Sequence, residues 1–322
     1  MRLLLVKTSS MGDVIHGLPV VTDLQAHRPD LTIDWVVEEA FADLPALHPG
    51  VARVQRVALR RWRRELLRTS TWREIGAARA ALRGRDYDAV LDLQGLAKSA
   101  WVARWAGAPI TGFARGCVRE PIAARFYAHA HSVDMRSHAI ERLRSLAGQA
   151  WGYTPQGLPS FGLRRDLPRP AWMPQGAVVL LHATSRAEKA WPDDAWVRTA
   201  QACARAGRVP LWPWGSAAEQ AQAQRLASLA GTGLVTPRMR VAEAAAMLLH
   251  ADGTVGVDTG LMHLSAAFER PTVAIFTATP AWRFGPYWTP AAVSLGGEGA
   301  PPRADDALAA LRSLGGLPGD AA

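Results

Sequence analysis

The chain has 322 residues, of which 49% are hydrophobic and 20% are charged, as in ordinary soluble globular proteins. This length favours two domains over one. Cys117 and Cys203 lie far apart and share no motif, which excludes a disulfide framework and a cysteine metal site. No segment approaches the roughly 20 apolar residues of a membrane span, and the first apolar run is too short for a signal peptide. We therefore expect a cytoplasmic protein.

The net charge of +9 is concentrated in the first half of the chain. Residues 1–160 carry 22 Lys and Arg against 15 Asp and Glu, whereas residues 161–322 carry 15 against 13. The segment 53–85 alone has 11 arginines and two acids, with Arg60, Arg61 and Arg63 around Trp62. Such a patch attracts a polyanion, either nucleic acid, anionic lipid or a phosphorylated glycolipid. The alternative is a helix face of solvated arginines.

The first thirteen residues predict a strand and a polar turn that opens a helix. Residues 2–6 form a short apolar run typical of a buried strand, and helical spacing begins at Val14. Asp13 lies in the intervening turn. In an open α/β sheet such turns line the ligand crevice, so Asp13 either faces a site or caps the helix.

The rest of the first half continues the pattern. We expect strands over 32–37 and 87–93 and helices over 75–82, 119–127 and 140–150. Lysine is rare, because only Lys7, Lys98 and Lys189 occur among 37 cationic residues. Each lies in or just after a predicted strand-to-helix turn. The lysine ammonium group is a compact point charge, which the larger arginine guanidinium does not always replace.

The second half repeats the alternation of strands and helices. Strands are predicted over 176–181, 209–213, 233–235, 253–257 and 271–276, and helices over 195–206, 217–230, 241–249, 261–268 and 304–314. The pattern predicts an α/β protein with two doubly wound parallel-sheet domains, 1–155 and 176–322, facing each other across a cleft. Residues 156–175 would form the linker, and the final helix could pack on the first domain.

Two turns of the second half suit a diphosphate. The loop 182–192 offers the hydroxyls of Thr184 and Ser185 and the charge of Lys189, and Asp258, Thr259 and Gly260 begin a helix. Free N–H groups at a helix start bind phosphate, although ordinary caps would explain either turn alone. No GxGxxG, P-loop or GxSxG motif occurs. His129, His131 and His138 do not share a helical face, and we expect no metal site.

Several motifs together resemble one family. In chain order they are Lys7-Thr-Ser-Ser-Met-Gly-Asp13, Asp34-Trp-Val-Val-Glu-Glu39, Arg60-Arg-Trp-Arg63, Asp92-Leu-Gln-Gly-Leu-Ala-Lys-Ser99, Arg119-Glu-Pro121, His182-Ala-Thr-Ser-Arg186, Lys189-Ala-Trp-Pro192, Pro213-Trp-Gly215 and Val257-Asp-Thr-Gly-Leu-Met-His263. This set resembles the lipopolysaccharide heptosyltransferases, which are ADP-heptose glycosyltransferases with the GT-B fold of two Rossmann-like domains. The first motif and Arg-Arg-Trp-Arg point to the type I branch.

The resemblance implies a role for each matching residue. Asp13 would be the general base and Lys189 would stabilise the leaving ADP. The positions that match the donor site are Thr184, Ser185, Lys189, Glu219, Met239, Asp258, Thr259, Gly260 and His263. The positions that match the acceptor side are Ser10, Gly12, Arg60, Arg61, Arg63, Gln94, Lys98 and Arg119. Two departures are the Thr-Ser pair, where Thr-Thr is usual, and the segment 277–283, to which we assign nothing.

The resemblance also implies the reaction. An inverting transfer would move heptose from ADP-L-glycero-β-D-manno-heptose to the 5-hydroxyl of the first Kdo of Kdo2-lipid A, without a metal or other cofactor. The enzyme would be a cytoplasmic monomer, peripherally associated with the anionic inner membrane. One alternative is a related heptosyltransferase acting on a later core acceptor. Another is a non-catalytic nucleic-acid-binding protein, but no such motif is present and no nucleic-acid partner is expected.

Overall fold

The computed structural model describes residues 1–184 and 186–318. The chain divides into two compact units, Met1–Arg164 and Arg165–Ala322, which are called here the N-terminal and C-terminal domains. Among the described residues, no helix combines the length and the apolar character needed to span a membrane.

The N-terminal domain is built on a sheet of six parallel strands. These are β1 (Arg2–Val6), β2 (Thr32–Glu38), β3 (Val51–Val57), β4 (Ala89–Asp92), β5 (Ile110–Phe113) and β6 (His129–His131). Their spatial order is β3-β2-β1-β4-β5-β6, so the direction of winding reverses between β1 and β4. The central strand β1 is buried on both faces because Leu3 to Val6 are all apolar.

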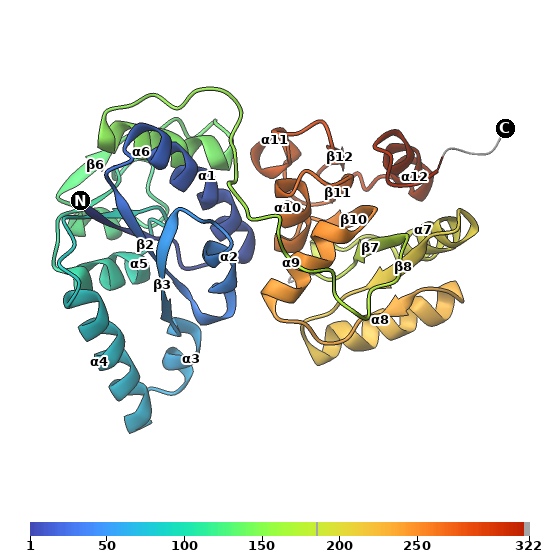
Figure 1. The fold of residues 1–322 in the computed structure, drawn as a ribbon, viewed down its shortest axis with the longest axis horizontal. Coiled ribbons are helices and arrows are strands. Elements are labelled where there is room, and N and C mark those ends of the chain that lie inside the picture. Colours follow the sequence, from blue (N-terminus) through green and yellow to red (C-terminus); the bar gives the residue numbers. More distant parts are fainter. Residues whose placement is uncertain (185, 319–322) are drawn as a thin grey trace. The chain divides into compact units, whose positions relative to one another are not determined.

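Helices cover both faces of this sheet (Figure 1). They are α1 (Met11–His27), η1 (Glu39–Phe41), α2 (Asp43–Ala46), α3 (Leu59–Arg64), α4 (Thr69–Arg83), α5 (Ala97–Ala103), η2 (Arg104–Ala106), η3 (Ala123–Phe126) and α6 (Ala139–Trp151). Leu4 and Val6 pack into one core with α4 and α5. On α1, a Cβ at Gly17 would lie 2.9 Å from Trp35 Cη2, so glycine allows this helix to approach β2 closely.

The C-terminal domain repeats the same topology. Its strands are β7 (Ala177–Leu181), β8 (Val209–Trp212), β9 (Leu234–Val235), β10 (Gly253–Val257), β11 (Thr272–Phe276) and β12 (Ala292–Gly296). All pairings are parallel, in the order β12-β11-β10-β7-β8-β9, and the winding reverses between β7 and β10. The predicted α/β fold class is confirmed, because each domain is a doubly wound, Rossmann-like parallel sheet.

The helices of this domain are η4 (Ala187–Lys189), α7 (Asp193–Arg205), α8 (Ala217–Ala230), α9 (Val241–His250), α10 (Gly260–Ala267), α11 (Ala281–Phe284) and α12 (Ala304–Ser313). Helices α7, α8 and α12 share one core with the strands. The final helix, which the sequence left open to pack on the first domain, packs on the sheet of its own domain because Ala307, Leu308 and Leu311 belong to that core.

Each domain therefore has one switch point, where adjacent strands lead to helices on opposite faces. In open α/β sheets the crevice outside the carboxyl ends of these two strands is the usual ligand site. The two switch points are β1/β4 and β7/β10. We call the edge at which the strands of a sheet end its carboxyl edge.

Candidate functional site

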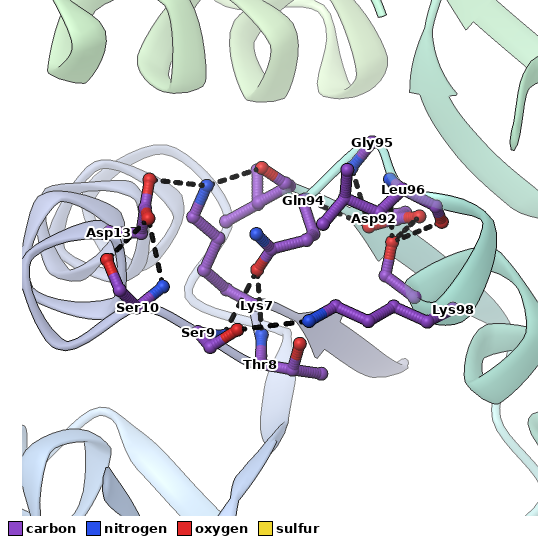
Figure 2. Close-up of polar contacts among 12 residues, drawn as sticks. Lys7, Thr8, Ser9, Ser10, Asp13, Asp92, Gln94, Gly95, Leu96 and Lys98 are labelled. Atoms are coloured by element: carbon purple, nitrogen blue, oxygen red, sulfur yellow. Dashed lines mark hydrogen bonds and ion pairs between the residues drawn. The ribbon is translucent and has the colours of Figure 1, made fainter. Parts of the chain in front are cut away.

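The N-terminal switch point brings together the turns after β1 and β4, with Lys7 and Gln94 between them (Figure 2). The Lys7 ammonium group donates to Leu93 O at 2.9 Å. The side-chain oxygen of Gln94 accepts hydrogen bonds from the backbone N–H of Thr8 at 3.0 Å and of Ser9 at 3.2 Å. These bonds fix the two turns to one another, and they use the acceptor atom of Gln94 to hold the backbone.

Asp13 occupies the first turn of α1 and uses one carboxylate oxygen as a cap. Its Oδ2 accepts hydrogen bonds from the backbone N–H of Ser10 at 2.9 Å and from the Ser10 hydroxyl at 2.8 Å. Its Oδ1 lies 3.7 Å from Lys7 Nζ and accepts no hydrogen bond from the described residues. The Asp13 side chain is 35% exposed. One oxygen thus caps the helix while the other lies beside Lys7 without a hydrogen bond from the described residues, so capping and a chemical role are compatible.

The surroundings of Asp13 favour its ionised form. Burial alone would raise the pKa of Asp13, but the Lys7 charge, the two Ser10 hydrogen bonds and the Arg119 charge together lower it below its usual value. The pKa of Lys7 is itself lowered, mainly by burial. At neutral pH Asp13 is therefore a carboxylate, as a general base must be.

The turn after β4 is organised by Asp92, to which the sequence assigned no role. This buried carboxylate accepts hydrogen bonds from the N–H of Gln94 at 2.9 Å, from the N–H of Gly95 at 3.3 Å and from the hydroxyls of Ser99 and Tyr127, each at 2.8 Å. Burial raises the pKa of Asp92. These hydrogen bonds fix the backbone of the turn and thereby the position of Gln94.

Lys98 and Arg119 add two further positive charges at this carboxyl edge. Gly95 has φ +69°, and a Cβ there would lie 3.1 Å from Val118 Cγ2, so glycine permits the tight turn beside the segment that carries Arg119. Lys98 Nζ donates to the Ser9 hydroxyl at 3.3 Å. Ser10 and Gln94 thus lie in the two turns of this switch point, and Gly12 and Lys98 lie in the first turns of the helices α1 and α5 that follow them.

The charge of Lys7 gives a testable pH effect. We expect Lys7→Met to raise the pKa of Asp13, because an opposite charge within roughly 4–6 Å favours the carboxylate. The acidic limb of the kcat/KM profile should move to higher pH by about one unit. Thermal unfolding of the variant would control for the lost hydrogen bond to Leu93. An unshifted limb in a folded variant would show that Lys7 does not tune Asp13.

The arginine segment is only partly available to a ligand. The Arg61 guanidinium is ion-paired with Glu39 at 3.1 Å and with Glu74 at 2.7 Å. The Arg60 guanidinium lies over the Phe41 ring, 5.5 Å from its centroid. Arg63 is exposed and makes no ion pair with the described residues. Because α3 directly follows β3, this segment lies at the same carboxyl edge as Asp13.

The C-terminal switch point is centred on Asp258. Its Oδ2 pairs with Lys189 Nζ at 2.6 Å and accepts the Thr279 hydroxyl at 2.7 Å, and its Oδ1 lies 3.1 Å from His263 Nε2. Burial opposes ionisation of Asp258, but the contacts with His263, Lys189 and Thr279 outweigh it and hold the pKa of Asp258 well below its usual range. The carboxylate therefore orients two basic side chains from two different segments.

This cluster joins the two turns that the sequence assigned to a diphosphate. Lys189 follows β7, and Asp258, Thr259 and Gly260 follow β10, where Thr259 is the N-cap of α10. Thr184 is half-buried and its hydroxyl accepts the N–H of Arg186 at 3.4 Å. Ser185 lies outside the described residues. The N–H groups of the first turn of α10 have no partner within the helix, which makes this edge suited to an anion.

Thr279 is a site residue that sequence reasoning missed. It lies in the segment 277–283, to which no role was given, yet its hydroxyl contacts Asp258. In the same segment the Thr277 hydroxyl donates to Glu188 O at 2.8 Å and fixes the loop that carries Lys189. The available signal was position, because this segment follows β11, the neighbour of β10.

The remaining predicted donor residues lie beyond β8 and β9. The Glu219 carboxylate accepts hydrogen bonds from the N–H of Gly215 at 2.7 Å and of Ser216 at 3.2 Å, so it caps α8. Met239 is half-buried in the loop before α9. Neither contacts the Asp258 cluster through a hydrogen bond among the described residues. Within residues 1–184 and 186–318, no group of three or more His, Cys, Asp or Glu is arranged to hold a metal.

Comparisons with known proteins agree on one family. Residues 75–307 match the family described as glycosyltransferase family 9 (heptosyltransferase). The chain is 45% identical to lipopolysaccharide heptosyltransferase 1 of Pseudomonas aeruginosa, over 87% of this chain and 79% of that protein. It is 41% identical to the Escherichia coli K12 protein of the same name, over 89% of this chain and 91% of that protein. The E. coli heptosyltransferase WaaC with ADP matches with a TM-score of 0.89 and 37% identity, over 98% of this chain and all of that one, which confirms the predicted GT-B fold.

Proposed function

Because the chain belongs to glycosyltransferase family 9, the heptosyltransferases, we propose that it transfers heptose from ADP-L-glycero-β-D-manno-heptose to the 5-hydroxyl of the first Kdo of Kdo2-lipid A. The chain is a glycosyltransferase of lipopolysaccharide core synthesis. A solved structure of the E. coli WaaC enzyme with ADP-2-deoxy-2-fluoro heptose, 39% identical with a TM-score of 0.83, supports this donor. The observation that supports the acceptor chemistry most is the ionised Asp13, whose Oδ1 accepts no hydrogen bond from the described residues and lies 3.7 Å from Lys7 Nζ.

In the proposed reaction Asp13 acts as the general base. As the acceptor oxygen bonds to the anomeric carbon of heptose, Asp13 Oδ1 takes the proton of the acceptor hydroxyl. The bond between the anomeric carbon and the β-phosphate oxygen breaks on the opposite side, which inverts the configuration and releases ADP. Lys7 keeps Asp13 ionised before the reaction, and the Ser10 hydrogen bonds hold Oδ2 so that Oδ1 is left to take the proton.

The donor would be held by the C-terminal switch point. The first turn of α10 and the hydroxyl of Thr184 would bind the diphosphate, and Lys189 would stabilise the charge on the leaving ADP. Asp258 would hold Lys189 and His263 in position, and its carboxylate would accept hydrogen bonds from hydroxyl groups of the heptose. Glu219 would bind the ribose while it caps α8, and Met239 would pack on the adenine. The electrostatic work is then done by Lys189 and the helix terminus.

The acceptor phosphates would be bound by the arginine segment with Lys98 and Arg119. Glu39 and Glu74 neutralise Arg61, so Arg60 and Arg63 supply the uncompensated charge. We expect replacement of Arg60, Arg61 and Arg63 together by glutamine to raise the acceptor KM and to make it less sensitive to salt, because fewer charges attract the phosphates. Initial rates at increasing ionic strength would measure both effects.

A matched control is available on α4. Arg79 and Arg83 are exposed there and make no ion pair with the described residues. The Arg79→Gln, Arg83→Gln variant should keep the acceptor KM of the parent. If the triple variant also keeps it, α3 is a solvated face and does not bind the acceptor.

The choice between Kdo2-lipid A and a later core acceptor can be tested directly. Transfer rates would be compared on Kdo2-lipid A and on a core that already carries heptose. Our proposal predicts transfer to the first and little to the second. The reverse preference would assign the protein to a later step of the same pathway.

A lipid acceptor also requires the enzyme to work at a membrane. We propose a peripheral association of the protein with the anionic cytoplasmic leaflet of the inner membrane, supported by the excess of positive charge in the first half of the chain.

A further inference from the structure

An exposed apolar tip lies at the junction of α3 and α4. Leu66 is 48% exposed, Leu67 is fully exposed at 102% and Trp72 is 57% exposed. The indole N–H of Trp72 donates to Leu66 O at 2.8 Å, which fixes the aromatic ring beside the loop. We call Leu66, Leu67 and Trp72 the apolar tip. Single exposed apolar residues need no explanation, but here three lie within seven residues of the chain, and a hydrogen bond fixes Trp72 to the backbone of Leu66.

Unpaired positive charge surrounds the apolar tip. Arg63 and Arg64 precede it on α3, and Arg73 follows Trp72 on α4. All three are exposed and make no ion pair with the described residues, whereas Arg68 is paired with Glu65 at 3.1 Å. The tip therefore combines apolar side chains with a net positive rim.

The position of the tip suits contact with a flat surface. In Figure 1 the loop between α3 and α4 lies at the lower end of the N-terminal domain, beyond the ends of its strands. Because α3 follows β3 directly, the tip extends from the same carboxyl edge as Asp13. A lipid that presents its head group at this edge would have its bilayer next to the tip.

We propose that the apolar tip inserts into the interface of an anionic bilayer, with Arg63, Arg64 and Arg73 on the lipid head groups. Burial of leucine and tryptophan side chains at the boundary of head groups and acyl chains is favourable in free energy, and anionic lipid attracts the arginines. Nucleic acid would satisfy the arginines but would leave Leu66 and Leu67 without a partner. The apolar tip and its arginines would thus be the surface through which the protein associates with the membrane, as proposed above. Vesicle binding by the tip does not depend on the proposed function, and only the statement that the bound lipid includes the acceptor rests on it.

Vesicle flotation tests this with the full-length protein and no acceptor. The parent should bind vesicles containing phosphatidylglycerol more strongly than pure phosphatidylcholine vesicles. The Leu66→Ser, Leu67→Ser variant should bind the anionic vesicles at least about tenfold more weakly, because burying one leucine is worth roughly a factor of ten or more. Trp72→Ser should weaken binding in the same direction.

Two control variants separate apolar insertion from charge. Leu158→Ser replaces a leucine that is 63% exposed in the same domain, and it should bind as the parent does. Arg64→Gln with Arg73→Gln should weaken binding to anionic vesicles and leave the weaker binding to neutral vesicles unchanged. Turnover on a deacylated, water-soluble acceptor should be the same in the leucine variant and the parent, which shows that the site is intact.

Three results would overturn the proposal. The first is that the parent binds anionic and neutral vesicles equally, and the second is that the Leu66→Ser, Leu67→Ser variant binds anionic vesicles as the parent does. The third is that, without vesicles, the parent self-associates and this variant does not, which would assign the tip to a second copy of the chain. The proposed reaction fails separately, because absence of heptose transfer alongside tip-dependent vesicle binding would overturn only the proposed function.

Discussion

The Asp13→Ala variant is expected to lose about 10²- to 10⁴-fold in kcat, the range that general-base catalysis contributes. The affinity for ADP should stay near that of the parent, because Asp13 lies in the N-terminal domain, whereas all residues of the proposed donor site belong to the C-terminal domain. Steady-state kinetics and ADP calorimetry on the same preparation would measure the two quantities.

Asp13→Asn separates the cap from the base. Its amide oxygen can still accept the Ser10 hydrogen bonds, whereas alanine removes them and should cost about 0.5–2 kcal/mol of stability. Both variants should lose activity to a similar extent, and only the alanine variant should unfold at a lower temperature. An asparagine variant that turns over near the parent rate would reduce Asp13 to a helix cap.

The second large effect is expected for Lys189→Ala. Removal of one preorganised donor to a developing negative charge costs about 10²–10³ in kcat, and donor KM should rise as well. The reason is specific to this structure, because Asp258 loses its partner at 2.6 Å and would be left as a carboxylate near the phosphates. Donor kinetics at saturating acceptor would measure the effect.

A double-mutant cycle sharpens this prediction. If Asp258 acts by orienting Lys189, then Asp258→Asn should cost much less in the Lys189→Ala background than in the parent. Lys98→Ala supplies a lysine control in the other domain, and its donor KM and ADP affinity should not change. Unchanged donor kinetics in Lys189→Ala would remove this lysine from the active site.

The central elements of both domains could be predicted from the sequence because their signals are local. The strands Arg2–Val6 and Gly253–Val257 were predicted with their observed bounds. Helix Ala217–Ala230 was also predicted with its observed bounds, since Ser216 and Glu219 cap its start and Gly231 ends it with φ +65°.

Peripheral strands were harder to predict because their pairing is not visible locally. Strand β6, His129–His131, has no apolar alternation and is defined by its bonds to β5. Strand β3 carries Arg53 and Arg56 on an exposed edge, and β5 and β12 were not predicted either. The helix predicted over 119–127 is wrong, because only the short 3₁₀ turn Ala123–Phe126 forms there.

The candidate site shows the same division. The sequence predicted that Asp13, Gln94, Lys98, Lys189 and Asp258 lie in or just after strand-to-helix turns, and the observed strand order brings these turns together in two groups, one in each domain. The partners that set their electrostatics come from distant segments, such as Thr279 for Asp258 and the pair Glu39 and Glu74 for Arg61. Sequence spacing shows which residues follow a strand, but it does not show which of them already neutralise each other in the folded protein.

The most direct measurement is mass spectrometry of Kdo2-lipid A after incubation with ADP-L-glycero-β-D-manno-heptose, for the parent and the Asp13→Asn variant. We expect the parent to add a single heptose and to release one ADP for each heptose added, and the folded, ADP-binding Asp13→Asn variant to form little product in the same time. Release of ADP without a heptosylated lipid, or equal product from the variant, would contradict this expectation.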